Sequence, residues 1–132
     1  MPDVSVELKI LMWSAILGLA QIVLAAAAST MQRGVRWNLG PRDEAPALTG
    51  MAGRLDRAFW NFMETFPIFA VAILAAGVIG KYSNTSMIGA YLYLIGRIVY
   101  VPLYAFGVPL ARTLAWTVSV VGIVMVIGVF FQ

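Results

Sequence analysis

The sequence predicts an all-α integral membrane protein whose single domain is a bundle of four transmembrane helices. Of its 132 residues, 61% are hydrophobic and only 11% are charged, whereas soluble domains are roughly half apolar and about a quarter charged. Four long apolar runs, each near or above the ~20 residues that cross a bilayer, are separated by more polar stretches. The chain is too short for two domains, so we expect one membrane domain over residues 1–132.

The first apolar run predicts a helix over residues 4–29. Its start carries Asp3, Glu7 and Lys9. A secretory signal peptide has a basic start and a shorter apolar core, so we expect this helix to be retained in the membrane. The next segment, residues 30–53, is the only substantial polar stretch. Its glycine- and proline-containing sequence predicts a long loop.

Three further helices are expected over residues 54–79, 86–106 and 111–131. Pro67 lies inside the second helix and removes a backbone hydrogen bond there, so we expect a kink. Pro102 is expected to interrupt the third helix. Short turns join the second helix to the third and the third to the fourth.

Arginine residues concentrate on one side of the predicted bundle. Those in the first connection or at the adjoining helix start are Arg33, Arg36, Arg42, Arg54 and Arg57. Arg112 lies beside the third connection, whereas the second connection has only Lys81. By the positive-inside rule, we expect the 30–53 loop to be cytoplasmic and both termini to face away from the cytoplasm.

The second helix carries polar side chains at helical spacing. At about 100° per residue, Arg54, Arg57, Asn61 and Glu64 fall on one stripe of this helix. A polar stripe in a membrane helix is costly unless it faces protein, water or a ligand. The pattern predicts either a polar ligand site or a buried ladder of ion pairs that only fixes helix packing.

The third helix carries a similar stripe of Tyr93, Arg97, Tyr100 and Tyr104. Arg97 lies so deep in the apolar run that it needs a partner. Glu64 is the only acid within a helix core, so we expect the two to pair. The tyrosines could instead form an aromatic belt at the membrane surface.

Arg112 opens the fourth helix beside Thr113, either as a ligand-binding group or as an interfacial anchor. The chain has no cysteine and no histidine. A protein thiol nucleophile, a serine–histidine triad and a histidine-built zinc site are therefore excluded, and we expect no metal. No basic run with interleaved aromatic residues occurs, so we expect no nucleic-acid partner.

The polar stripe of the second helix belongs to a longer segment, Arg57-Ala-Phe-Trp-Asn61-Phe-Met-Glu64-Thr-Phe-Pro67-Ile-Phe69. This segment resembles the signature of the MAPEG superfamily, the membrane-associated proteins in eicosanoid and glutathione metabolism. The third helix is similar to the family pattern R-x-x-[HY]-x-x-x-Y-x-x-G from Arg97 to Gly107, through Tyr100 and Tyr104. The resemblance covers the whole chain in length, number of spans and motif order.

The resemblance implies a homotrimer that sits in lipid and binds glutathione between neighbouring subunits, near the cytoplasmic face. Arg57 and Asn61 would bind the glutathione backbone. Glu64 would bind its amino group or a structural arginine.

The resemblance also implies that Arg97, Tyr100 and Tyr104 line the second wall of the site and that Arg112 lies near the thiol. A thiol with a pKa near ~8.5 is mostly protonated at neutral pH. A nearby arginine favours the reactive thiolate, and a shift of ~2 units requires about 2.7 kcal/mol. We therefore expect Arg112 to be the catalytic residue of a glutathione transferase, or of a transferase that is also a peroxidase, acting on lipophilic electrophiles.

Two residues depart from the family pattern. Thr65 stands where members often have a tyrosine, and Phe59 where they have a polar residue such as glutamine. These departures favour a second hypothesis, a non-enzymatic lipid-binding or accessory protein of the same superfamily. A third hypothesis is a small exporter with Glu64 as its proton carrier, although Glu64 shares its stripe with Arg57 and Asn61. A bacterial inner membrane and an endoplasmic reticulum membrane both fit the sequence.

Overall fold

The computed structural model describes residues 3–132, and every regular element in that range is a helix. The four long helices are α1 (Val6–Arg33), α3 (Gly50–Val78), α4 (Asn84–Ala105) and α5 (Pro109–Phe130). The short helix α2 (Val35–Leu39) lies between α1 and α3. Each of the four long helices is long and apolar enough to cross a membrane, so the predicted all-α, four-span membrane fold is confirmed.

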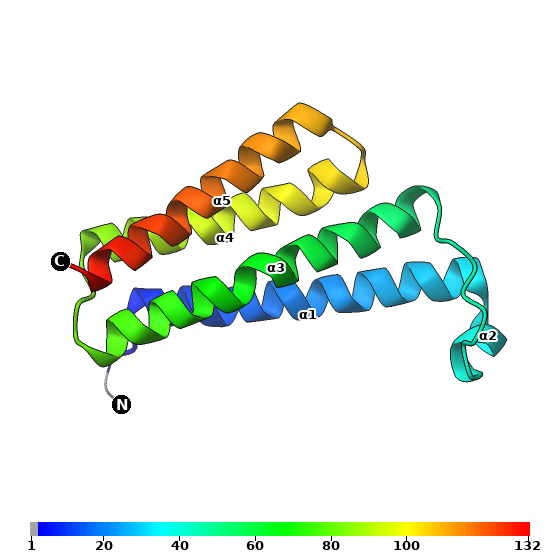
Figure 1. The fold of residues 1–132 in the computed structure, drawn as a ribbon, viewed down its shortest axis with the longest axis horizontal. Helices are drawn as coiled ribbons and strands as arrows, with labels where there is room; N and C mark the ends of the chain where they lie inside the picture. Colours follow the sequence, from blue (N-terminus) through cyan, green and yellow to red (C-terminus); the bar gives the residue numbers. More distant parts are fainter. Residues whose placement is uncertain (1–2) are drawn as a thin grey trace.

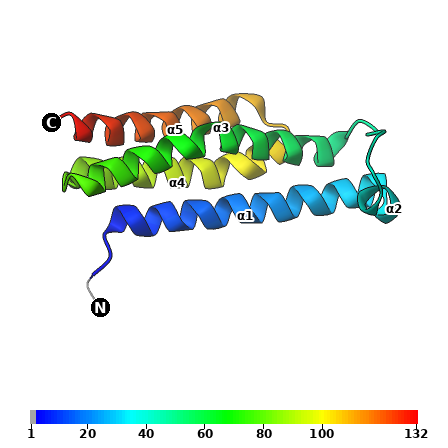
Figure 2. The same cartoon turned by 60° about the horizontal axis from the view of Figure 1, so that its bottom comes forward.

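The long helices run side by side and alternate in direction (Figures 1 and 2). The start of α1, the end of α5 and the α3–α4 turn lie at one end of the bundle, which we call the terminal end. The α1–α3 connection and the α4–α5 turn lie at the other end, which we call the loop end. The start of α3 and the end of α4 are therefore neighbours at the loop end, where Arg54 bonds to Ala105, 51 residues further along the chain.

The polar connection between α1 and α3 is shorter than the expected loop of residues 30–53. α1 continues to Arg33, and α3 already begins at Gly50. Gly34 ends α1 with a φ of 96° and donates its N–H to the carbonyl of Thr30 at 2.8 Å. A positive φ of this size is readily adopted only by glycine, so the helix end is determined by one residue inside the expected loop.

Gln32, near the end of α1, forms hydrogen bonds with Thr49, directly before α3. Its amide nitrogen donates to the Thr49 hydroxyl at 2.8 Å, and its amide oxygen accepts the Thr49 N–H at 2.9 Å. Trp37 lies between two guanidinium groups, those of Arg33 at 4.6 Å and Arg42 at 5.5 Å from its ring centroid. These contacts hold the end of α1 beside the start of α3.

Both interior prolines lie within continuous helices. α3 passes through Pro67, and α4 passes through Pro102 to Ala105. The expectation that Pro102 interrupts the third helix was therefore wrong. A proline is tolerated inside a membrane helix because neighbouring helices and local adjustment compensate for the lost backbone hydrogen bond.

α4 and α5 form the most closely packed pair because small residues face each other along their contact. A Cβ atom on Gly89 would lie 2.7 Å from the carbonyl oxygen of Gly122, and one on Gly96 would lie 2.9 Å from that of Ala115. No real side chain tolerates such distances. In a bilayer, close backbone approach of this kind is a main source of helix–helix affinity.

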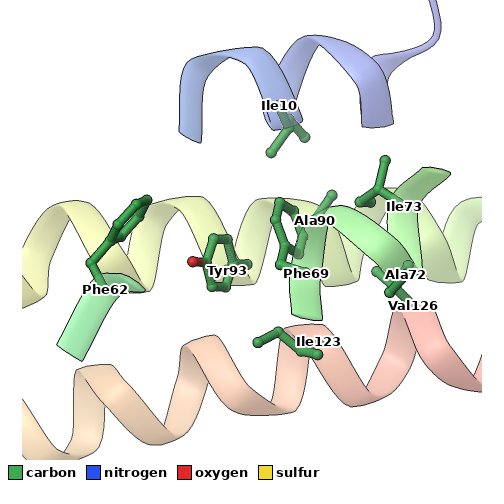
Figure 3. Packing of buried hydrophobic residues seen from close by; sticks show 9 residues of the cluster. All are labelled: Ile10, Phe62, Phe69, Ala72, Ile73, Ala90, Tyr93, Ile123 and Val126. Carbon is green, nitrogen blue, oxygen red and sulfur yellow. The ribbon is translucent and has the colours of Figure 1, made fainter. Parts of the chain in front are cut away.

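The apolar core joins all four long helices (Figure 3). Ile10 contributes from α1, Phe69 from α3, Tyr93 from α4 and Ile123 from α5. The rings of Phe69 and Tyr93 stack with centroids 3.9 Å apart, and neither residue is exposed. This core fixes the relative rotation of α3 and α4, and hence which side chains meet at the loop end.

Candidate functional site

A polar pocket of about 290 Å³ opens at the loop end, where α3, α4 and α5 meet. Its lining residues are Asn61, Tyr100, Tyr104, Arg112, Thr113 and Trp116. Four of the seven residues that the sequence singled out are among them: Asn61, Tyr100, Tyr104 and Arg112. They converge because the α4–α5 turn folds the start of α5 back beside the end of α4.

Tyr104 connects two of the predicted arginines. The Nε–H of Arg57 donates to the Tyr104 hydroxyl at 3.1 Å. The guanidinium of Arg112 lies 4.6 Å from the centroid of the Tyr104 ring, within the range of a cation–π interaction. Arg57 itself is exposed and does not line the pocket, but its contact with Tyr104 places its charge at the rim. Two cations from different helices thus flank one side chain of the pocket, an arrangement suited to an anionic ligand.

Arg97 lies behind the pocket wall rather than in it. Its side chain is completely buried, and its Nη1 donates to the amide oxygen of Asn61 at 2.8 Å. Its guanidinium carbon is 4.2 Å from the centroid of the Tyr100 ring. Within residues 3–132, its Nε and Nη2 have no hydrogen-bond partner. Arg97 therefore orients two lining residues, Asn61 and Tyr100, from inside the bundle.

The expected pair of Glu64 with Arg97 is not formed. Arg97 donates to Asn61 instead, and Glu64 is exposed on the outer surface of α3. Three residues of the predicted stripe, Arg54, Arg57 and Asn61, form hydrogen bonds with α4, whereas Glu64 forms none with it. A carboxylate exposed in the middle of a membrane helix is costly unless something outside this chain or water meets it. Within one chain, the structure does not bring Glu64 to the polar pocket.

Two lining residues, Thr113 and Trp116, were not among the predicted site residues. Thr113 follows Arg112 directly, and its hydroxyl donates to the carbonyl of Pro109 at 3.0 Å. Trp116 lies one helical turn beyond Arg112, and its residue type is typical of a packing or interfacial position. The spacing of four residues between Arg112 and Trp116, which places both on one helix face, was the signal that could have found Trp116.

The two departures from the family pattern both lie outside the polar pocket. Thr65 is buried, and its hydroxyl lies 3.1 Å from the Tyr93 hydroxyl. Phe59 lines a different hollow of about 510 Å³, on the side of α3 that faces α1 and Trp37. Neither residue therefore removes a polar group from the pocket of its own chain.

The start of α3 is also fastened directly to the end of α4. The Nε–H of Arg54 donates to the carbonyl oxygen of Ala105 at 2.7 Å. This carbonyl lies at the C-terminal end of α4, where backbone acceptors lack helical partners and a cation is favourable. Arg54 thus stabilises the junction of α3 and α4 beside the pocket. The four polar residues of the α3 stripe each have a different environment: Arg54, Arg57, Asn61 and Glu64.

Comparison with known proteins supports the sequence resemblance. The model of the MAPEG family matches residues 10–131. No curated protein and no solved structure matches the chain. The family match spans all four long helices and every residue that lines the polar pocket. This chain therefore belongs to the MAPEG family, the membrane proteins of eicosanoid and glutathione metabolism.

Proposed function

We propose that this protein is a membrane-bound glutathione transferase that conjugates the glutathione thiolate to lipophilic electrophiles. The observation that carries the proposal is the pair of guanidinium groups, Arg57 and Arg112, that flank Tyr104 at the polar pocket. Glutathione has two carboxylates, one ammonium and one thiol. Arginine side chains match carboxylates with paired hydrogen bonds and stabilise a thiolate by charge.

In this proposal the two arginines have different tasks. Arg57 is exposed at the rim and binds a carboxylate of the tripeptide, and Asn61 contacts its backbone. Arg112 is half-buried in the pocket wall, where lower solvent screening strengthens its effect on the thiol. Thr113 can accept a hydrogen bond there, but its own proton is already donated to Pro109. We assign the stabilisation of the thiolate to Arg112 because it is the positively charged residue among those that line the pocket.

The proposal includes a homotrimer with the site between subunits. A pocket of about 290 Å³ is at the lower end of the ~300–1,000 Å³ of typical ligand sites. Glu64 is exposed on α3 and suited to bind the glutathione ammonium or an arginine of a neighbouring subunit. A neighbouring subunit packed against this surface would both enlarge the pocket and provide a partner for Glu64.

The alternative is a non-enzymatic lipid-binding or accessory protein of the family. The sequence feature that favours it is the departure from the family pattern at Thr65 and Phe59, although both residues lie outside the polar pocket of their own chain. Isothermal titration of the detergent-purified protein with glutathione, followed by a conjugation assay with a chloronitrobenzene, separates the two. Saturable binding with conjugation supports the transferase, binding without conjugation supports the accessory role, and absence of binding refutes the proposed site.

A further inference from the structure

A largely apolar groove of about 540 Å³ lies on the outside of α1 and α3 at the terminal end, far from the polar pocket. Leu8, Met12 and Ala15 line it from α1, and Leu74 lines it from α3. A smaller hollow of about 240 Å³ shares Leu8 and Leu74 and extends the apolar surface to Tyr82. We call the larger hollow the Lys9 groove, after its one charged lining residue.

Lys9 lines the groove near the start of α1, next to Leu8 and Val4. It lies in the first turns of α1, whose 28 residues extend about 42 Å. The hydrocarbon core is only ~30 Å thick, so α1 is longer than the core is thick. The charged residues Glu7 and Lys9 favour a position of its first turns in the headgroup region. Trp13, one turn further and 61% exposed, is a residue type that concentrates at this level. Met12 and Ala15 continue the groove from there toward the hydrocarbon.

The nearest acid on α1 does not face the groove. Glu7 is only 5% exposed, and its carboxylate accepts a hydrogen bond from the hydroxyl of Ser86, on α4, at 2.5 Å. Lys9, by contrast, is exposed on the outer side of the helix. Among the described residues that line the groove, Lys9 is therefore the cationic one, and its neighbours in the lining are apolar.

A second apolar groove provides a comparison. It lies between α3 and α5, has a volume of about 410 Å³, and is lined by residues such as Pro67, Val71 and Phe130. No charged side chain lines it. It can accept any acyl chain, whereas the Lys9 groove can also select a headgroup.

We propose that the Lys9 groove binds an anionic phospholipid, with one acyl chain along Met12, Ala15 and Leu74 and its phosphate paired with Lys9. An anionic lipid retains its net charge for Lys9, whereas a zwitterionic lipid neutralises its own phosphate with its amine. The binding site stabilises the α1–α3 contact at the end of the bundle opposite the polar pocket. It is independent of glutathione binding and of the proposed enzymatic function.

The test is lipid retention by the whole purified protein, counted by native mass spectrometry after incubation with equal amounts of phosphatidylglycerol and phosphatidylcholine. We expect preferential retention of phosphatidylglycerol. Lys9→Gln should weaken that retention roughly fivefold, the effect of one cation near an anionic headgroup. Ala15→Phe fills the groove and should weaken retention of both lipids.

Matched controls exist for both changes. Lys81 lies exposed at the same end but donates to the backbone carbonyl of Gln132, so Lys81→Gln should leave lipid retention unchanged. Ala20 is exposed on α1 outside the groove, so Ala20→Phe should also have no effect. Helicity measured by circular dichroism verifies that each variant is folded.

Three results would overturn the proposal. The first is equal retention of the two lipids by the unaltered protein. The second is an equal loss of phosphatidylglycerol from the Lys9→Gln and Lys81→Gln variants. The third is dissociation of an oligomer by Ala15→Phe, because a second copy of this chain, rather than lipid, would then cover the groove.

Discussion

Arg57 donates its Nε–H to the hydroxyl of Tyr104 at 3.1 Å, and this bond joins the start of α3 to the end of α4 across 47 residues of sequence. The same tyrosine supports Arg112 through its ring face, with the guanidinium 4.6 Å from the ring centroid. Tyr104 thus contacts two guanidinium groups in different ways, that of Arg57 through its hydroxyl and that of Arg112 through its ring. Substitutions of Tyr104 can therefore remove these contacts one at a time.

Tyr104→Phe removes the hydroxyl but retains the ring. We expect glutathione to bind roughly fivefold more weakly, as for the loss of one hydrogen bond worth about 1 kcal/mol, because Arg57 loses its fixed orientation. The pKa of the bound thiol should not change. Tyr104→Leu also removes the ring under Arg112 and should raise that thiol pKa. Titration calorimetry and the ultraviolet thiolate band measure the two effects, and identical behaviour of both variants would contradict the separation.

Asn61→Ala removes the one hydrogen-bond acceptor that the buried Arg97 has within residues 3–132. Leaving a buried charge unpaired costs several kcal/mol, whereas replacing the charge by an apolar side chain of similar volume is often tolerated. We therefore expect Asn61→Ala to lower the thermal unfolding midpoint in detergent more than Arg97→Met does. In the Arg97→Met variant, Asn61 stays half-exposed at the pocket, where water can satisfy it. A larger loss of stability for Arg97→Met would refute this view of the pair.

Gly89→Ala tests the close packing of α4 on α5. The added methyl group would lie 2.7 Å from the Gly122 carbonyl oxygen, so the helices must separate. We expect a loss of about 1–3 kcal/mol, the usual cost of overpacking. Gly128→Ala is the matched control, since a Cβ there meets no atom within 4 Å. Comparable unfolding midpoints for the two variants would show that the helices do not depend on this contact.

Labelling with an impermeant thiol reagent tests the orientation in the membrane. The sequence contains no cysteine, so a single introduced cysteine reports one position. Ala47→Cys lies exposed in the α1–α3 connection, and Lys81→Cys lies exposed at the opposite end. If the arginine-rich connection is cytoplasmic, reagent outside intact cells should label position 81 and spare position 47. The reverse pattern would invert the topology.

The apolar runs were sufficient to predict four spans and their approximate limits, because length and hydropathy decide whether a helix crosses a bilayer. The early start of α3 was not predictable, since it depends on the pairing of Gln32 with Thr49, 17 residues away. Helical spacing also predicted that Tyr93, Arg97 and Tyr100 share a face, and all three are buried. These predictions need only the geometry of one helix.

The partners of the polar residues could not be predicted in the same way. Spacing places Asn61 and Glu64 on one stripe, but the rotation of α3 against α4 decides which of them meets Arg97. That rotation is set by core contacts such as the stack of Phe69 on Tyr93. Trp116 was missed for a similar reason, because its residue type favours an interfacial interpretation and only the fold places it in the pocket.

The titration of the thiolate absorption of bound glutathione, in the unaltered protein and in Arg112→Ala, tests the central claim most directly. Stabilisation of the anion lowers the thiol pKa, so the thiolate band should appear about 2 pH units below the ~8.5 of a free thiol in the unaltered protein. If Arg112 supplies about 2 kcal/mol of this effect, Arg112→Ala should move the band to higher pH and slow conjugation roughly thirtyfold. Glutathione affinity should change less than turnover, because the lost interaction is stronger with the thiolate than with the thiol. An unchanged thiolate pKa with full activity in Arg112→Ala would contradict the account and leave Arg112 as an interfacial anchor.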